Sequence, residues 1–397
     1  MWDELHQKLK GKGINIRSIW IADVAHQGAS GVLNEGKLGD DREYPKTSKS
    51  RRMSMSNIDP PASWNDHLRD LFLMINHFRH EIKQPIVGVG HSMGGCHLVN
   101  LALMHPRLFS TLVLIDPVIQ RLPSRQGNYG PAKASTFRRD RWPSRQAAEA
   151  SFKRSKFYQS WDSRVLDLWI KYGLRDLPTL LHPDATPASG TLPATNADPS
   201  SATISPGKEI EKEVTLTTTK HQEVFTFMRP NFPGPTNLNP ETSPNPTTHP
   251  DVNPEAGPNA PFYRPEPLAT FRQLPFLRPS VLYIFGDQSF LSAPLLKADK
   301  LAHTGTAPGG SGGVKKGRVR EVTFEGIGHL IPMEVVGMTA DACEEWLTSE
   351  LRDWQSKEAE QRLAWEKVPR LERGKMSEEF VRVMKSDWMG EPEKPKL

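Results

Sequence analysis

The chain has 397 residues, 37% of them hydrophobic, and carries 51 basic and 46 acidic side chains, for a formal net charge of +5. Because this excess is small and no basic stripe interleaved with aromatic residues is present, the composition argues against a nucleic-acid-binding protein. Two cysteines, a charged N-terminal segment and the lack of any apolar run near the roughly 20 residues that cross a bilayer argue against a disulfide-rich secreted domain and a membrane span.

The first part of the chain predicts alternating helices and strands. Residues 2–11 indicate an amphipathic helix, and residues 14–25 are rich in β-branched and aromatic side chains, as in a strand. Residues 64–81 carry apolar side chains at helical spacing. Two short apolar segments, 85–90 and 112–115, predict buried strands on either side of another helix. This order of elements predicts a parallel sheet with helical crossovers.

The middle of the chain differs in composition. Residues 39–62 are polar and predict a solvated loop, and residues 120–180 predict basic helices without strands. Residues 183–212 and 233–260 are rich in Pro, Ser, Thr and Asn and lack periodicity, so we expect them to be disordered. The more apolar residues 214–232 lie between them and are expected to pack with the helices of 120–180.

Strand patterns return in the last third of the chain. Residues 280–285 and 319–324 predict two further strands, separated in part by a Gly-rich loop at 305–317. A long helical region follows at 333–368, and a last helix is expected at 377–388. These elements extend the predicted parallel sheet after a long insertion.

The motif that carries the most information is GHSMGG, residues 90–95, directly after an apolar strand and before a helix. This is the G-x-S-x-G pattern of a nucleophile elbow, and it predicts Ser92 as a catalytic nucleophile. We expect Gly90 and Gly94 to be required because the sharp turn leaves no room for Cβ atoms. The backbone N–H of Met93 is the expected oxyanion donor. The alternative is a Gly-rich turn in a protein without activity.

A serine nucleophile needs a base and an acid. His329 stands just after the last predicted strand and is the expected base; His91, His97, His105 and His221 lack such a position.

The acid has two candidates, Asp116 and Asp287. In most hydrolases with such an elbow, the acid follows the strand before the histidine. That position is occupied here by Ser289, two residues after Asp287. Asp116 ends the strand that follows the nucleophile helix, so its carboxylate can reach His329 from the neighbouring strand. We favour Asp116, and expect Asp287 to shape its turn.

The runs IWIADVAHQGASGVLNEGKLG, VGHSMGG, LVLIDP and LRPSVLYIFGD resemble fungal toxin-biosynthesis hydrolases, which are peroxisomal α/β-hydrolases of toxin and mycophenolic acid pathways. The resemblance implies an α/β-hydrolase fold, a mostly parallel sheet flanked by helices with a large helical lid. It implies a triad of Ser92, Asp116 and His329 that hydrolyses an ester or acyl-CoA thioester in secondary metabolism. No metal and no cofactor are implied.

The family carries further strands and an oxyanion loop before the point that corresponds to Met1. We therefore expect a truncated gene product with impaired activity, and the alternative function is that of a hydrolase-fold binding protein. Removing one oxyanion donor costs on the order of 100- to 1000-fold in rate. We expect four regions: an N-terminal core, a lid insertion, a C-terminal core, and a C-terminal helix and tail, at residues 1–118, 119–278, 279–368 and 369–397.

Partners are suggested by two charged segments. The final residues Pro395, Lys396 and Leu397 resemble the S-K-L peroxisomal address and predict binding of an import receptor. Without import we expect a cytoplasmic protein, and a homodimer is left open. Ten basic residues of the lid could bind coenzyme A phosphates or form a solvated face: Arg121, Arg125, Lys133, Arg138, Arg139, Arg141, Arg145, Lys153, Arg154 and Lys156.

Overall fold

A computed structural model describes residues 1–38, 63–122, 125–183, 212–230, 251 and 261–386. The loop expected at 39–62, nearly all of the segments expected to be disordered, and the C-terminal tripeptide lie outside these residues. The chain forms two compact units, Met1–Leu347 and Thr348–Leu397.

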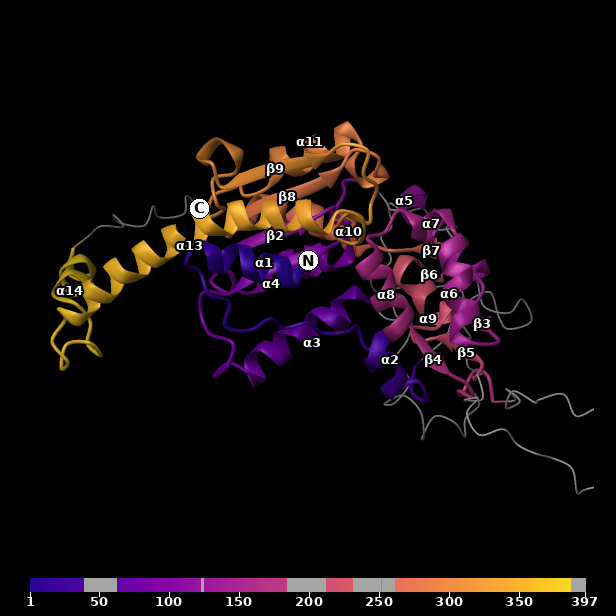
Figure 1. Ribbon diagram of the computed structural model, residues 1–397. Helices are drawn as coiled ribbons and strands as arrows, with labels where there is room; N and C mark the ends of the chain where they lie inside the picture. The colour runs from indigo at the N-terminus through magenta and orange to yellow at the C-terminus, as the bar shows by residue number, and fades with distance from the viewer. Residues whose placement is uncertain (39–62, 123–124, 184–211, 231–250, 252–260, 387–397) are drawn as a thin grey trace, which may run out of the picture. The chain divides into compact units, whose positions relative to one another are not determined.

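The first unit is built on a parallel sheet with the strand order β1-β2-β8-β9 (Figure 1). These strands are β1 (Val87–His91), β2 (Thr111–Ile115), β8 (Ser280–Gly286) and β9 (Val319–Phe324). All three pairings are parallel, which confirms the predicted sheet and its strands at these positions. Every residue of β2 and β8 is buried, as expected for central strands covered by helices on both faces.

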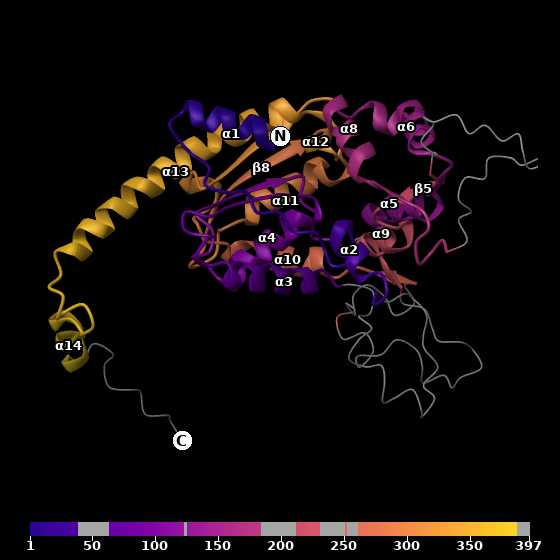
Figure 2. The same cartoon turned by 60° about the horizontal axis from the view of Figure 1, so that its bottom comes forward.

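Helices cover the two faces of this sheet (Figure 2). Helix α1 lies beside the start of α13 on one face, where Lys8 forms an ion pair of 2.5 Å with Asp341. Helices α3, α4 and α10 lie on the other face. The flanking helices are α1 (Trp2–Gly11), α3 (Trp64–His77), α4 (Met93–Met104), α10 (Glu266–Gln273), α11 (Pro294–His303) and α13 (Val336–Glu366). The predicted helices at 2–11 and 64–81 are confirmed, the second ending at His77.

The insertion between β2 and β8 forms a group of helices beyond one end of the sheet (Figure 1). The described helices are α5 (Arg125–Phe137), α6 (Arg145–Arg154), α7 (Lys156–Gln159), α8 (Ser163–Tyr172) and α9 (Lys220–Phe227). They have a core of their own, in which Trp142, Phe152 and Tyr158 pack with buried aliphatic side chains. The helical character expected for 120–180 is confirmed.

The expectation that 120–180 lacks strands was wrong. Strands β3 (Arg141–Trp142) and β4 (Leu174–Asp176) pair antiparallel with β5 (Val214–Leu216). Each is two or three residues long, too short for an alternating pattern to be recognised in the sequence. A second small ladder joins β6 (Arg229–Pro230) to β7 (Phe262–Tyr263).

The prediction of a strand at residues 14–25 was also wrong. This segment forms no ladder, and Ile21 is 71% exposed. A strand requires partners for its backbone N–H and C=O groups. Strand β1 is the edge of the sheet within the described residues, so no described strand pairs with 14–25. The chain instead continues through a turn into the short helix α2 (Gly28–Asn34).

The second unit contains the C-terminal part of α13 and helix α14 (Glu378–Lys385). The helices expected at 333–368 and 377–388 are both confirmed. A short helix, α12 (Ile331–Glu334), precedes α13 and is separated from it by Val335.

Candidate active site

Ser92 lies at the sharp turn between β1 and α4, with a φ of 56°. A Cβ atom on Gly90 would meet the Gly94 carbonyl carbon at 2.6 Å, and one on Gly95 would meet Pro117 at 2.7 Å. The steric requirement expected at Gly94 was wrong, since a Cβ there meets nothing within 4 Å. The turn is therefore made possible by Gly90 and Gly95.

The structure brings Ser92, His329 and Asp116 into one hydrogen-bonded chain. His329 Nδ1 lies 2.7 Å from Asp116 Oδ2, and His329 Nε2 lies 2.9 Å from Ser92 Oγ. Because a carboxylate only accepts, Nδ1–H is the donor to Asp116. Nε2 is then free to accept the proton of the Ser92 hydroxyl. This is the arrangement that activates a serine nucleophile.

Asp116 is fully buried and its charge is held by several donors. Its Oδ1 accepts a hydrogen bond of 2.6 Å from the hydroxyl of Ser292, and its Oδ2 accepts one from Ser289. Asp116 has a φ of 39°, and with Ser92 it is one of the two non-glycine residues at positive φ in the described part of the chain. Such backbone conformations are costly and cluster at functional sites.

Ser289 and Ser292 were not identified as functional residues from the sequence. The available signal was the position of Ser289, which stands where the acid of the triad is usually found. The serine hydroxyl there binds a carboxylate that comes from the neighbouring strand.

The hydrogen bonds described for Asp287 do not include His329. Asp287 Oδ1 accepts hydrogen bonds from the backbone N–H of Gly326 at 2.8 Å and from the side chain of Gln288. Gly286 lies so close to the same loop that a Cβ atom on it would meet the Gly328 carbonyl oxygen at 2.4 Å. Asp287 and Gly286 therefore hold the loop that carries His329 against the end of β8.

A second contact holds this loop from β1. His91 Nε2 lies 2.8 Å from the carbonyl oxygen of His329, and the two rings are 4.8 Å apart. Since a carbonyl only accepts, His91 must donate from Nε2. Burial, with the neighbouring His329 as the next cause, lowers the pKa of His91 to about 4. His91 was placed among the non-catalytic histidines in the sequence, and its supporting contact was missed.

The remaining candidates occupy other environments. The Met93 N–H is the first of α4, where backbone donors have no partner within the helix. His97 is buried in α4, His105 is exposed, and His221 lines a cavity of the insertion.

The insertion approaches the loop of His329. The backbone N–H of Asp162, which caps α8, donates to the carbonyl of Met333, four residues after His329.

Most of the basic side chains described in the insertion form internal contacts. Among the ten basic residues singled out in the sequence of the insertion, five form ion pairs with acidic residues, namely Arg121, Arg138, Arg141, Arg145 and Lys153. These five charges are largely compensated within the protein.

No helix among the described residues is long and apolar enough to cross a membrane. The described side chains also contain no group of three or more His, Cys, Asp or Glu residues suited to a metal ion.

Known proteins resemble this chain over most of its length. The model of the alpha/beta hydrolase family matches residues 1–345. A protein of Penicillium roqueforti named type I acyl-CoA thioesterase mpaH is 40% identical over 91% of this chain and 76% of its own length. The type I acyl-CoA thioesterase mpaH' of Penicillium brevicompactum is 39% identical over 88% of this chain and 73% of its own.

Among solved structures, the peroxisomal alpha-beta-hydrolase Lpx1 of Saccharomyces cerevisiae superimposes with a TM-score of 0.51. The match covers 91% of this chain and 71% of Lpx1 at 13% identity, which is evidence for a common fold alone. The agreement of the family match over residues 1–345 with the parallel sheet and the elbow at Ser92 shows that the chain belongs to the alpha/beta hydrolase family.

Proposed function

We propose that the protein is a serine hydrolase that cleaves an acyl-CoA thioester or a related ester, with Ser92 as nucleophile, His329 as base and Asp116 as acid. The proposal rests on one observation above all, the continuous hydrogen bonding from Ser92 through His329 to Asp116. A hydroxyl within 2.9 Å of an imidazole nitrogen can transfer its proton as it attacks a carbonyl.

In the first half of the reaction His329 takes the proton of Ser92, and the oxygen attacks the acyl carbonyl carbon. The negative charge that develops on the carbonyl oxygen is stabilised by the N–H of Met93 at the start of α4. Asp116 stabilises the imidazolium and keeps its Nδ1 proton in place. His329 then protonates the leaving thiolate or alkoxide, and an acyl-Ser92 intermediate remains.

In the second half water replaces the leaving group. His329 removes a proton from the water, which attacks the acyl carbon, and Ser92 is released with the proton from His329. The contacts of His91 and Asp287 to the loop of His329 would keep the imidazole aligned in both halves. No atom other than those of the chain, the substrate and water is required.

The substrate class is supported by the relatives at 40% and 39% identity, both named type I acyl-CoA thioesterases. The experiment that tests it measures thiol release from acyl-CoA substrates of increasing chain length. Ser92→Ala should reduce turnover on the order of 1000-fold or more, while the matched variant Ser110→Ala should behave as wild type. No thioester or ester hydrolysis by folded wild-type protein would favour the alternative of a hydrolase-fold binding protein.

We further propose import into peroxisomes through Pro395, Lys396 and Leu397, on the resemblance of this tripeptide to S-K-L. The test is the location in fungal cells of the chain fused at its N-terminus to a fluorescent protein. Deletion of Leu397 should move the fusion from peroxisomes to the cytoplasm. The same distribution with and without Leu397 would contradict the proposal.

A further inference from the structure

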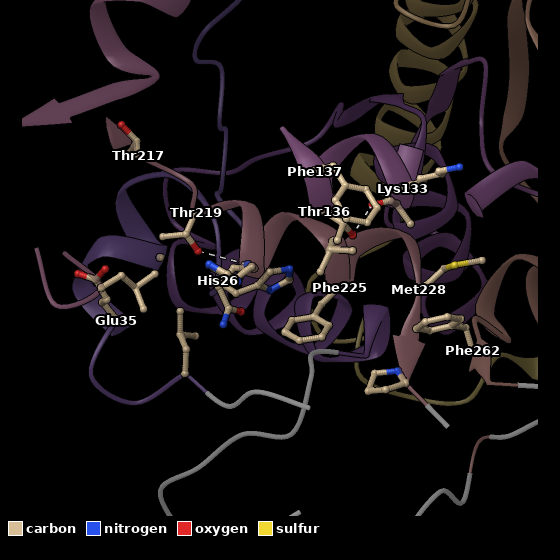
Figure 3. A pocket seen from close by; sticks show the side chains of 18 of the residues that line it. His26, Glu35, Lys133, Thr136, Phe137, Thr217, Thr219, Phe225, Met228 and Phe262 are labelled. Atoms are coloured by element: carbon tan, nitrogen blue, oxygen red, sulfur yellow. Dashed lines mark hydrogen bonds between the residues drawn. The ribbon is translucent and has the colours of Figure 1, made fainter. Parts of the chain in front are cut away.

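A cavity of about 760 Å³ lies between the insertion and the segment that carries α2, and its volume is within the range of small-molecule sites. Its wall is formed by α2, α5 and α9 with short adjoining segments, and Ser92, His329 and Asp116 are not among its lining residues. Much of the lining is apolar, including Phe137, Val224, Phe225, Met228 and Phe262. Figure 3 shows His26 in the middle of the lining, with Phe225 beside it and Met228 and Phe262 further along.

His26 is the unusual residue of this cavity. Its side chain is 4% exposed, and neither ring nitrogen has a hydrogen-bond partner within the described residues. A buried polar group without a partner is costly, so such groups are uncommon in folded proteins. Burial, with the nearby charge of Arg264 as the next cause, lowers the pKa of His26 to about 4. At neutral pH the ring is therefore uncharged and offers one donor and one acceptor.

The backbone around His26 is fixed to the insertion. The N–H of Gly28 donates to Thr218 Oγ1 at 2.9 Å, and the side chain of Gln27 donates to Thr226. On the other side, Asn34 donates to the carbonyl of Ala25 at 2.9 Å. These contacts hold the loop that carries His26 against the insertion and support its place in the cavity wall.

The buried charges of the lining argue against an anionic occupant beside them, while the remaining charged residue of the lining, Lys133, is exposed. Arg175 forms a two-armed ion pair with Glu35, with N–O distances of 3.0 and 2.5 Å, and both side chains are less than 20% exposed. The guanidinium is therefore neutralised by a carboxylate that would repel a phosphate or a fatty-acid head group. His26 adds no positive charge, and the deep part of the cavity suits an uncharged molecule.

We propose that this cavity is a small-molecule site, separate from the Ser92 centre, that binds an uncharged and largely apolar molecule whose hydroxyl or amide group bonds to His26. A hydroxyl or an amide can donate to the bare nitrogen of a neutral imidazole or accept from its N–H. The surrounding aromatic and aliphatic side chains would cover the rest of the molecule.

The test compares two isomers, 1-octanol and heptyl methyl ether, by isothermal titration calorimetry with the full-length protein. The alcohol is the more strongly hydrated of the two, so a purely apolar cavity favours the ether. Hydrogen bonding to His26 reverses this order, and we expect the alcohol to bind about tenfold more tightly. Octanoate, the anionic probe, should bind more weakly than the alcohol.

Three variants localise the effect. In His26→Phe the preference for the alcohol should disappear while the ether still binds. Thr136→Trp places a large side chain in the cavity wall, and we expect it to weaken binding of both isomers at least tenfold. Ala134→Trp, on the same helix but outside the lining, is the matched control and should bind as wild type. Far-UV circular dichroism and the melting temperature establish that each variant is folded.

Equal affinity for the two isomers in wild-type protein would overturn the proposal. So would an unchanged preference in His26→Phe, or equal binding by Thr136→Trp and Ala134→Trp. These measurements involve no turnover, so their failure would leave the proposed hydrolase activity untouched. Conversely, loss of hydrolysis in Ser92→Ala says nothing about this cavity.

Discussion

His26 should make the stability of the protein depend on pH. Its folded-state pKa lies at about 4, against 6.5 for an unhindered histidine, because the ring is buried. Between these values the unfolded chain binds a proton at this residue and the folded chain does not. Stability is therefore lost as the pH falls from 6.5 towards 4.

The size of this loss follows from the two pKa values. A pH of 4.5 lies two units below the ordinary pKa of the imidazole in the unfolded chain. At 1.36 kcal/mol per unit, proton binding there favours the unfolded state by about 2.7 kcal/mol. Slight protonation of His26 in the folded state restores a few tenths of a kcal/mol. The net loss in the free energy of unfolding is therefore about 2.5 kcal/mol. This is a large part of the roughly 5–15 kcal/mol that stabilises a domain.

The assay is urea unfolding at pH 7.0 and pH 4.5, followed by tryptophan fluorescence. His26→Phe keeps an aromatic ring of similar shape and breaks no hydrogen bond, because neither nitrogen of His26 has a described partner. The free energy of unfolding of this variant should fall by about 2.5 kcal/mol less than that of wild type between the two pH values. His105→Phe, at an exposed position, is the control. The same pH dependence in His26→Phe and in wild type would show that His26 does not have a lowered pKa in the folded protein.

Three further predictions concern the catalytic centre. Asp116→Asn should lower kcat on the order of 1000- to 10,000-fold, and Asp287→Asn far less, in a p-nitrophenyl ester assay; a larger loss at Asp287 would exchange their roles. Ser289→Ala should lower kcat roughly tenfold through loss of one hydrogen bond to a carboxylate, and an unchanged kcat would remove it from the site. Gly90→Ala should lower the melting temperature by several degrees and Gly94→Ala should not, since only a Cβ on Gly90 meets backbone atoms; equal shifts would contradict this.

The sheet could be predicted because its strands carry local signals. The segments at 112–115 and 280–285 are continuous apolar runs, which is how a strand buried on both faces is recognised. The segment at 14–25 has a similar composition but forms no strand, because pairing depends on a neighbour that local sequence does not reveal. Strands β3, β4 and β5 were missed because two or three residues give no periodic pattern.

The sequence allowed prediction of those site residues whose roles follow from their position along the chain. Ser92 and His329 follow strands, and their places relative to those strands suggested their roles. The donors to Asp116 were not accessible, since Ser289 and Ser292 lie more than 170 residues from it in the chain. His91 was missed for the same reason, because its partner is the backbone of His329.

Covalent labelling with a fluorophosphonate probe tests whether Ser92 is an activated nucleophile, because the probe reacts with a serine only where a base activates it. Peptide mass spectrometry of the labelled full-length protein should place the modification on Ser92. Labelling should be absent in Ser92→Ala and at least 100-fold slower in His329→Gln, with both variants folded. Modification of a different serine, or unchanged labelling in His329→Gln, would contradict the assignment of Ser92 and His329 as nucleophile and base.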